Sequence, residues 1–217
     1  MNIIRNPERE SWEQLLKRPL QDPDQINESV TAILDDVRKN GDYALRKYTR
    51  ALDGANIEEI AVDEDQVIES ERYLDRSLKN AIQKASENIR KFHKAQVGQD
   101  VAVEVSPGLR CWQKAVPIDS IGIYIPGGTA PLFSSVLMMA IPASVAGCKN
   151  VVLATPPDEE GNVHPAILYA AALGGVSKIY RVGGAQAIAA MAYGTETVPK
   201  VNKIFGPGNQ FVTLAKQ

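Results

Sequence analysis

A repeated pattern in the second half of the chain restricts the fold more than any other feature. Short runs rich in apolar residues are each followed by glycine or proline and then by a stretch with helical spacing. The runs recur roughly every 25 to 30 residues, which is the size of a βαβ unit. They cover residues 121–125, 150–154, 178–182 and 203–205. Strands that alternate with helices predict a parallel sheet with helices on both faces.

Helices are predicted after each run, at 134–146, 165–173, 185–193 and from about Asn209 onward. The runs VVLA and IGIYI are nearly continuous in apolar residues, as expected of strands that are buried on both sides. Residues 119–217 are therefore predicted to form one α/β domain with a doubly wound sheet of the nucleotide-binding type.

Residues 1–118 are predicted to be mainly helical, with a short β segment near 101–118. Apolar residues recur at helical spacing in several series. These series cover 27–37, 43–48, 63–74 and 77–96. Gly41 and Gly54 are predicted to end two of them. Within the β segment the alternation is broken by a Pro-Gly pair, which predicts two strands around a turn.

Composition and charge exclude several functional classes. The net charge of −2, the isoelectric point of about 5.8 and the lack of a basic stripe argue against a nucleic-acid partner. No run approaches the roughly 18 apolar residues of a membrane span, and the N-terminus lacks the apolar segment of a signal peptide. Two cysteines suit a reducing compartment. We expect a cytoplasmic protein with no membrane partner.

The last residues, FVTLAKQ, are amphipathic and are followed by neither a helix C-cap nor a closing strand. A strand followed by an unfinished helix is typical of a cut chain. We therefore expect this chain to be the N-terminal part of a longer protein.

Glycine and proline gather where the predicted strands end. Three of these loops read Pro126-Gly127-Gly128, Gly183-Gly184-Ala185-Gln186 and Gly206-Pro207-Gly208-Asn209, and the remaining one begins Thr155-Pro156-Pro157. Ligands of doubly wound sheets bind at the carboxyl ends of the strands. Glycine lets the backbone approach a ligand, and a helix N-terminus offers free N–H groups to an anion. The loops together predict a crevice for a phosphate-bearing cofactor, with Tyr124 near its mouth and the amides of Gln186 and Asn209 facing it.

The residues themselves do not name that cofactor. Neither the dinucleotide signature G-x-G-x-x-G nor a P-loop is present. No histidines or cysteines have metal-ligand spacing, and we predict neither a metal site nor a general base. His164 is interpreted as an exposed structural residue, and Cys148 as a small residue between a helix and a strand.

Two long strings closely resemble the histidinol dehydrogenase family. They are IGIYIPGGTAPLFSSVLMMAIPASVAGCKNVVLATPP and RVGGAQAIAAMAYGTETVPKVNKIFGPGNQFVTLAK. The segments NGDYALRKYTRALDG, ENIRKFHKAQ and PGLRCWQKAVPI look like the same family, so the resemblance covers essentially the whole chain. It implies a homodimeric oxidoreductase that uses NAD and zinc to convert L-histidinol through L-histidinal to L-histidine, the last two steps of histidine biosynthesis. It also implies a Rossmann-like domain of aldehyde-dehydrogenase-like architecture.

The resemblance further implies particular cofactor contacts. The tyrosine of the Y-[IV]-P-G-G loop is Tyr124, the glutamine of G-G-A-Q is Gln186, and the asparagine of G-P-G-N is Asn209. Pro126 and Gly208 are weaker candidates from the same loops. The family's zinc ligands, its Glu-His pair and its histidinol contacts lie beyond the last residue here. No catalytic or metal-binding residue is therefore assigned, and we expect the chain to be inactive alone.

Two alternatives belong to other classes. In the first alternative, the chain is a non-catalytic module that binds a nucleotide in the same crevice. The other is an aldehyde-dehydrogenase-like enzyme that acts through a cysteine thiolate. The second is disfavoured because Cys148 is predicted at the opposite edge of the sheet, before its strand.

Overall fold

A four-stranded parallel sheet forms the centre of the protein, in the strand order β5–β4–β3–β6. We describe it from a computed structural model that covers residues 3–17, 23–128 and 130–217. The strands are β3 (Ser120–Tyr124), β4 (Asn150–Thr155), β5 (Lys178–Arg181) and β6 (Lys203–Phe205). All four strands were predicted, and the predicted parallel arrangement is confirmed.

The alternation of side chains along the strands divides the core into two layers. Ile121 and Ile123 of β3 point to one face, and Tyr124 points to the other. In β4, Leu153 joins the layer of the isoleucines, whereas Ala154 joins that of Tyr124. Because both faces are buried, the strands are apolar along nearly their whole length.

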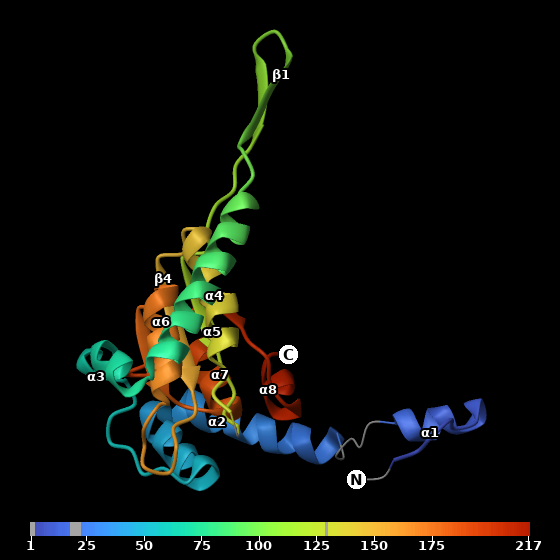
Figure 1. The fold of residues 1–217 in the computed structure, drawn as a ribbon, viewed down its shortest axis with the longest axis vertical. Helices are drawn as coiled ribbons and strands as arrows, with labels where there is room; N and C mark the ends of the chain where they lie inside the picture. Colours follow the sequence, from blue (N-terminus) through green and yellow to red (C-terminus); the bar gives the residue numbers. More distant parts are fainter. Residues whose placement is uncertain (1–2, 18–22, 129) are drawn as a thin grey trace.

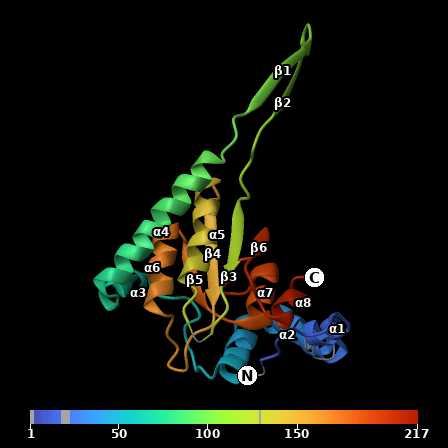
Figure 2. The same cartoon turned by 45° about the vertical axis from the view of Figure 1, so that its right-hand side comes forward.

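Helices from both halves of the chain cover the sheet. Figure 2 shows α4, α5 and α6 on one side of the sheet and α2, α7 and α8 on the other. Their bounds are α2 (Pro23–Tyr48), α4 (Arg76–Ala95), α5 (Phe133–Val145), α6 (Pro165–Gly174), α7 (Gly184–Tyr193) and α8 (Gln210–Ala215). Helices α2 and α4 precede residue 119, so the mainly helical first region completes the covering layers of the sheet.

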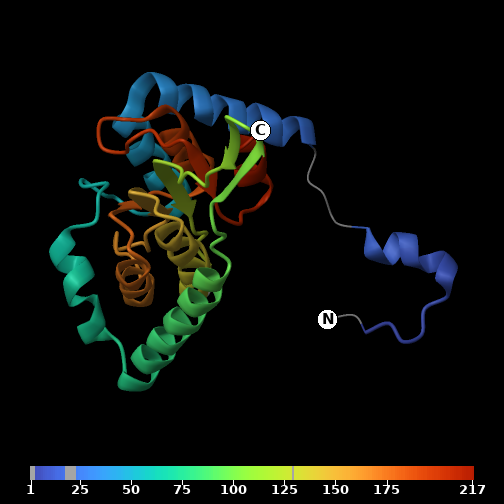
Figure 3. The ribbon, with the colours of Figure 1, turned by 90° about the horizontal axis from the view of Figure 1, so that it is seen from above.

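The shorter elements lie around this body. They are η1 (Arg9–Ser11), α1 (Trp12–Leu16), η2 (Thr49–Asp53), α3 (Glu64–Glu69) and η3 (Ser70–Tyr73). Helix α1 lies apart from the sheet and its covering helices (Figure 3). Within the described residues, no helix combines the length and the apolar character needed to cross a membrane.

A long β-hairpin projects away from the body (Figure 1). Its strands are β1 (Val101–Ser106) and β2 (Leu109–Gln113), paired antiparallel as predicted. Every residue of both strands is exposed, including Val103 and Trp112. An isolated two-stranded ribbon is marginally stable in water. The hairpin therefore leaves uncovered apolar surface outside the two core layers.

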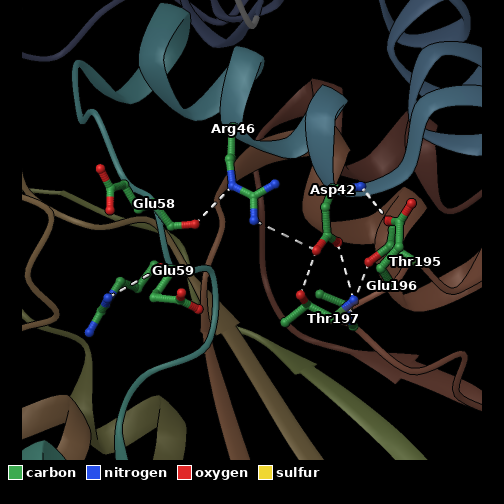
Figure 4. Close-up of polar contacts among 9 residues, drawn as sticks. Asp42, Arg46, Glu58, Glu59, Thr195, Glu196 and Thr197 are labelled. Atoms are coloured by element: carbon green, nitrogen blue, oxygen red, sulfur yellow. Dashed lines mark hydrogen bonds and ion pairs between the residues drawn. The ribbon is translucent and has the colours of Figure 1, made fainter.

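Gly41 interrupts α2, as predicted, with φ of 50° and ψ of −130°. The helix resumes at once instead of ending, and the next residue, Asp42, is anchored on the loop after α7 (Figure 4). The carboxylate of Asp42 accepts hydrogen bonds from the backbone N–H and the hydroxyl of Thr197. In return, the Asp42 N–H donates to Glu196 Oε2 over 2.8 Å. These bonds tie the kinked helix to the loop between α7 and β6.

Charge and burial act in opposite directions on Asp42. Burial raises the pKa of its carboxyl group, but the hydrogen bonds from Thr197 and Thr195 outweigh burial and hold the pKa below its ordinary value. Arg46, whose Nη2 lies 4.0 Å from Asp42 Oδ2, acts in the same direction as the threonines. The ionised form of Asp42 is therefore the one that stabilises the fold.

We expect Asp42→Ala to lower the free energy of unfolding by about 2 to 3 kcal/mol, because it leaves donors of Thr197 without a partner. The loss should shrink as the pH falls, because a carboxyl group with a lowered pKa contributes stability above its unfolded-state pKa and loses it in acid. Urea denaturation at several pH values measures both effects. Asp35→Ala, at an exposed site on the same helix, is the control; equal losses in the two variants would contradict the anchoring role of Asp42.

Candidate functional site

The loops at the carboxyl ends of the parallel strands surround a cavity of about 660 Å³. Loops after β3, β4, β5 and β6 all contribute to its lining, so the structure brings the predicted loops together. The described lining residues are Ser29, Ile33, Leu52, Asp53, Tyr124, Pro126, Gly127, Gly128, Pro156, Pro157, Gly184, Ala185, Gln186, Asn209 and Phe211. The volume lies within the range of small-molecule and cofactor sites.

One wall of the cavity comes from the first region of the chain and was not predicted. Ser29 and Ile33 of α2 line it, and Leu52 and Asp53 of η2 continue the wall. The sequence ALDG read only as a helix end, because Gly54 adopts the left-handed conformation that commonly follows a helix. No local pattern indicated that this helix end faces the strand-end loops.

The glycines of these loops serve first to let the loops pack on one another. A β-carbon on Gly127 would lie 2.7 Å from the ring of Pro156, and one on Gly183 would lie equally close to the same ring. A β-carbon on Gly206 would collide with the backbone oxygen of Tyr124. Only Gly128 of these four faces open space. The sequence interpretation, in which the glycines admit a ligand, is therefore supported at Gly128, while the others hold the rim together.

Tyr124 lies deeper than the sequence indicated. It was predicted near the mouth of the crevice, but it is buried, with 3% of its surface exposed. Its hydroxyl oxygen accepts a hydrogen bond of 3.0 Å from the N–H of Gly184, at the start of α7. Burial raises the pKa of Tyr124, and the negative charge of Asp53 acts in the same direction. The neutral phenol keeps its own proton, which is available to a ligand.

Gln186 is the least satisfied polar residue of the site. Its side chain is fully buried, yet neither Oε1 nor Nε2 has a hydrogen-bond partner in the structure. A buried polar group without a partner costs roughly 1 to 3 kcal/mol. Because Gln186 lines the cavity, a bound ligand is the natural source of both missing partners.

Of the other predicted cofactor contacts, two line the cavity and one does not. Asn209 lines the cavity and caps α8, because its Oδ1 accepts a hydrogen bond of 3.1 Å from the N–H of Val212. Pro126 also lines the cavity. Gly208 is absent from the described lining; a β-carbon there would collide with Val212, so packing against α8 accounts for this glycine.

Asp53 is the only described lining residue with a charged side chain. Its carboxylate lies against Gly183, with Oδ1 and Oδ2 at 3.1 and 3.3 Å from where a β-carbon of Gly183 would stand. Oδ2 is inaccessible to solvent and has no hydrogen-bond partner. Burial raises the pKa of Asp53 to about 6.

A cluster of metal-ligating side chains is not found at this cavity among the residues that the structure describes. Among the described residues, no three histidine, cysteine, aspartate or glutamate side chains are placed to hold a metal ion. His164 caps α6, since its Nδ1 accepts a hydrogen bond from the N–H of Ala166. Cys148 lies between α5 and β4, at the edge opposite the strand-end loops.

Comparison with known proteins gives a consistent result. The sequence model of the family described as histidinol dehydrogenase matches residues 16–217. Histidinol dehydrogenase of Bacteroides fragilis is 53% identical over 217 residues, which are all of this chain and 51% of that protein. The Escherichia coli K12 protein of the same name is 50% identical over 209 residues, 96% of this chain and 47% of that protein.

A solved structure shares the fold. The crystal structure of histidinol dehydrogenase from Elizabethkingia anophelis superposes with a TM-score of 0.88 at 49% identity, over 98% of this chain and 49% of the other. The chain thus spans about half the length of the relatives that it matches.

The raised pKa of Asp53 predicts a particular dependence of stability on pH. Between the ordinary pKa of 3.8 and about 6, the folded state binds a proton that the unfolded state has released. Stability therefore falls as the pH rises through this window.

Asp53→Asn removes the charge and should raise the melting temperature by a few degrees at about pH 7.5, corresponding to about 1 kcal/mol after allowance for partial exposure. Below about pH 4 the two proteins should melt alike, since both are neutral at this position. Differential scanning calorimetry at both pH values tests this, and a lower melting temperature for Asp53→Asn at the higher pH would contradict it.

Proposed function

The chain belongs to the histidinol dehydrogenase family, and we propose that its strand-end cavity binds NAD. The observation that carries the proposal is the amide of Gln186, fully buried beside the cavity and without a partner for either polar atom. A nucleotide offers hydroxyl donors together with hydroxyl and phosphate acceptors, which satisfy both atoms of a carboxamide.

The surroundings of Gln186 fit a dinucleotide in other respects. The phenol of Tyr124 keeps a proton for a ligand acceptor, and the backbone at Gly128 is open to close approach. No lysine or arginine is among the described lining residues, so backbone N–H groups of the strand-end loops are left to bind the phosphates.

The reaction proposed for the longer protein is the oxidation of L-histidinol through L-histidinal to L-histidine, the last two steps of histidine biosynthesis. When bound, NAD supplies the hydride acceptor. The residues of this chain hold and orient the dinucleotide: Gln186, Asn209 and Pro126 line its site, and Tyr124 supports the turn into α7. The cavity lacks a metal-ligand cluster among its described residues and does not fit zinc. Zinc, its ligands and the catalytic base are proposed to belong to the part of the family's length that this chain does not cover, in a cytoplasmic homodimer.

Gln186→Leu provides a direct test of the cofactor site. Leucine has a similar size and removes two unsatisfied atoms, so we expect the melting temperature to stay the same or to rise. The affinity for NADH should fall at least about tenfold, because hydrogen bonds to the ligand are lost. Fluorescence titration with NADH measures the affinity. The control is Gln14→Leu, on the exposed surface of α1. Unchanged affinity in Gln186→Leu would remove the basis of the proposal.

The 217-residue chain is expected to bind NADH without turning over substrate, because among the described residues no group of side chains is placed to hold a metal ion. L-histidinol and NAD⁺ mixed with the chain should give no NADH absorbance above background. Turnover by the chain would show that its own residues complete the active site. Binding without turnover is also what a non-catalytic nucleotide-binding module would give. A form of the protein that carries the remainder of the family's length separates the two, since only the dehydrogenase proposal expects NADH from it.

A further inference from the structure

Three polar groups converge on the dipeptide Gly183–Gly184, of which Gly184 lines the cavity. Asp53 lies against Gly183, and the hydroxyl of Tyr124 accepts the N–H of Gly184. The carboxamide of Gln186 lies beside Gly184 on the same turn. Two of these groups, the carboxylate of Asp53 and the amide of Gln186, have buried atoms without a hydrogen-bond partner. The resemblance to the family singled out Tyr124 and Gln186 but not Asp53.

The chemistry of Asp53 restricts what can face it. An ionised carboxylate only accepts hydrogen bonds, and a buried acceptor requires a donor or a cation. No cationic side chain, second acid or histidine is among the described lining residues, and the described residues contain no group of three histidine, cysteine, aspartate or glutamate side chains that could hold a metal ion. A phosphate is repelled by the same charge. The matching ligand group is therefore a neutral one that donates through hydroxyls.

We propose that Asp53 binds the cis hydroxyls of a ribose of the dinucleotide, with the carboxamide of Gln186 as the neighbouring partner of the same sugar. This inference rests on the proposed NAD site and assigns it a further binding residue. An acidic residue that binds ribose hydroxyls recurs in doubly wound dinucleotide sites, where it follows a strand of the same sheet. Here the acid comes from η2, in the first region of the chain, and reaches the sheet edge from outside.

The assignment has a measurable signature in paired binding and stability data. Asp53→Asn keeps the shape and one acceptor but loses the charge, so charge-assisted hydrogen bonds to the sugar are weakened. We expect the affinity for both NAD⁺ and NADH to fall by roughly five- to tenfold, and by more than tenfold in Asp53→Ala. The ligand-free melting temperature of Asp53→Asn should not fall at neutral pH, since the variant relieves a desolvated charge. Isothermal titration calorimetry and thermal melting on the 217-residue chain provide both readouts, with Asp35→Asn as the matched surface control.

Comparison of the oxidised and reduced cofactors separates the sugar from the nicotinamide ring. Loss of affinity for NAD⁺ alone would mean that Asp53 interacts with the positive ring, and this would overturn the ribose assignment. An affinity for NADH within twofold of the wild type would overturn it as well. A joint fall of affinity and melting temperature would assign Asp53 a structural role instead. If the wild-type chain binds neither NAD⁺ nor NADH, the proposed function itself fails, which is a different result from all of these.

NADPH identifies which of the two riboses is bound. Its extra phosphate is on the adenosine ribose, so a carboxylate at that sugar repels it. If Asp53 binds the adenosine ribose, the wild type should prefer NADH over NADPH by at least about tenfold, and Asp53→Asn should narrow this preference. If it binds the nicotinamide ribose, Asp53→Asn should weaken NADH and NADPH by the same factor. Either outcome supports the binding of a ribose by Asp53.

Discussion

The close packing of the strand-end loops is the constraint on which the cavity depends. The ring of Pro156, after β4, sits between Gly127, after β3, and Gly183, after β5, where any side chain would collide with it. This contact fixes three neighbouring strand ends relative to one another. It also holds the turn into α7 where the N–H of Gly184 reaches the hydroxyl of Tyr124. The cavity is thus shaped by contacts between loops before any ligand is considered.

Beside these packed loops, the fold leaves some polar groups without hydrogen-bond partners. Gln186 and Asp53 both have buried atoms without partners, and burial alone is enough to raise the pKa of Asp53 to about 6. Such groups destabilise the ligand-free chain, and they persist in a fold only where other contacts offset them. The two core layers and the Asp42–Thr197 anchor supply that stabilisation. The unpartnered polar atoms of Gln186 and Asp53 therefore lie where the ligand is proposed to bind.

Sequence reasoning succeeded where local pattern and chain order decide the structure. The apolar runs predicted the strands, and parallel pairing then required their loops to meet at one edge of the sheet. It was less accurate where contacts between segments that are distant in the sequence determine the structure. The burial of Tyr124 arises from packing in the layer that also contains α2, and this packing is not encoded in the IGIYIPGG stretch. Asp53 was missed for the same reason, because only its contact with Gly183, far along the chain, distinguishes it from an ordinary residue at a helix end.

Through the wall formed by α2 and η2, residues 1–118 contribute to the cavity at the strand ends of residues 119–217. The kink at Gly41 and the anchor of Asp42 on Thr197 determine where the second part of α2 runs. That part leads directly into η2, which carries Leu52 and Asp53 to the cavity. Residues 119–217 alone would keep the strand ends but would lose this wall and its only described charged group. The position of the Asp53 carboxylate at the sheet edge therefore depends on an interaction made by α2, the helix that precedes η2.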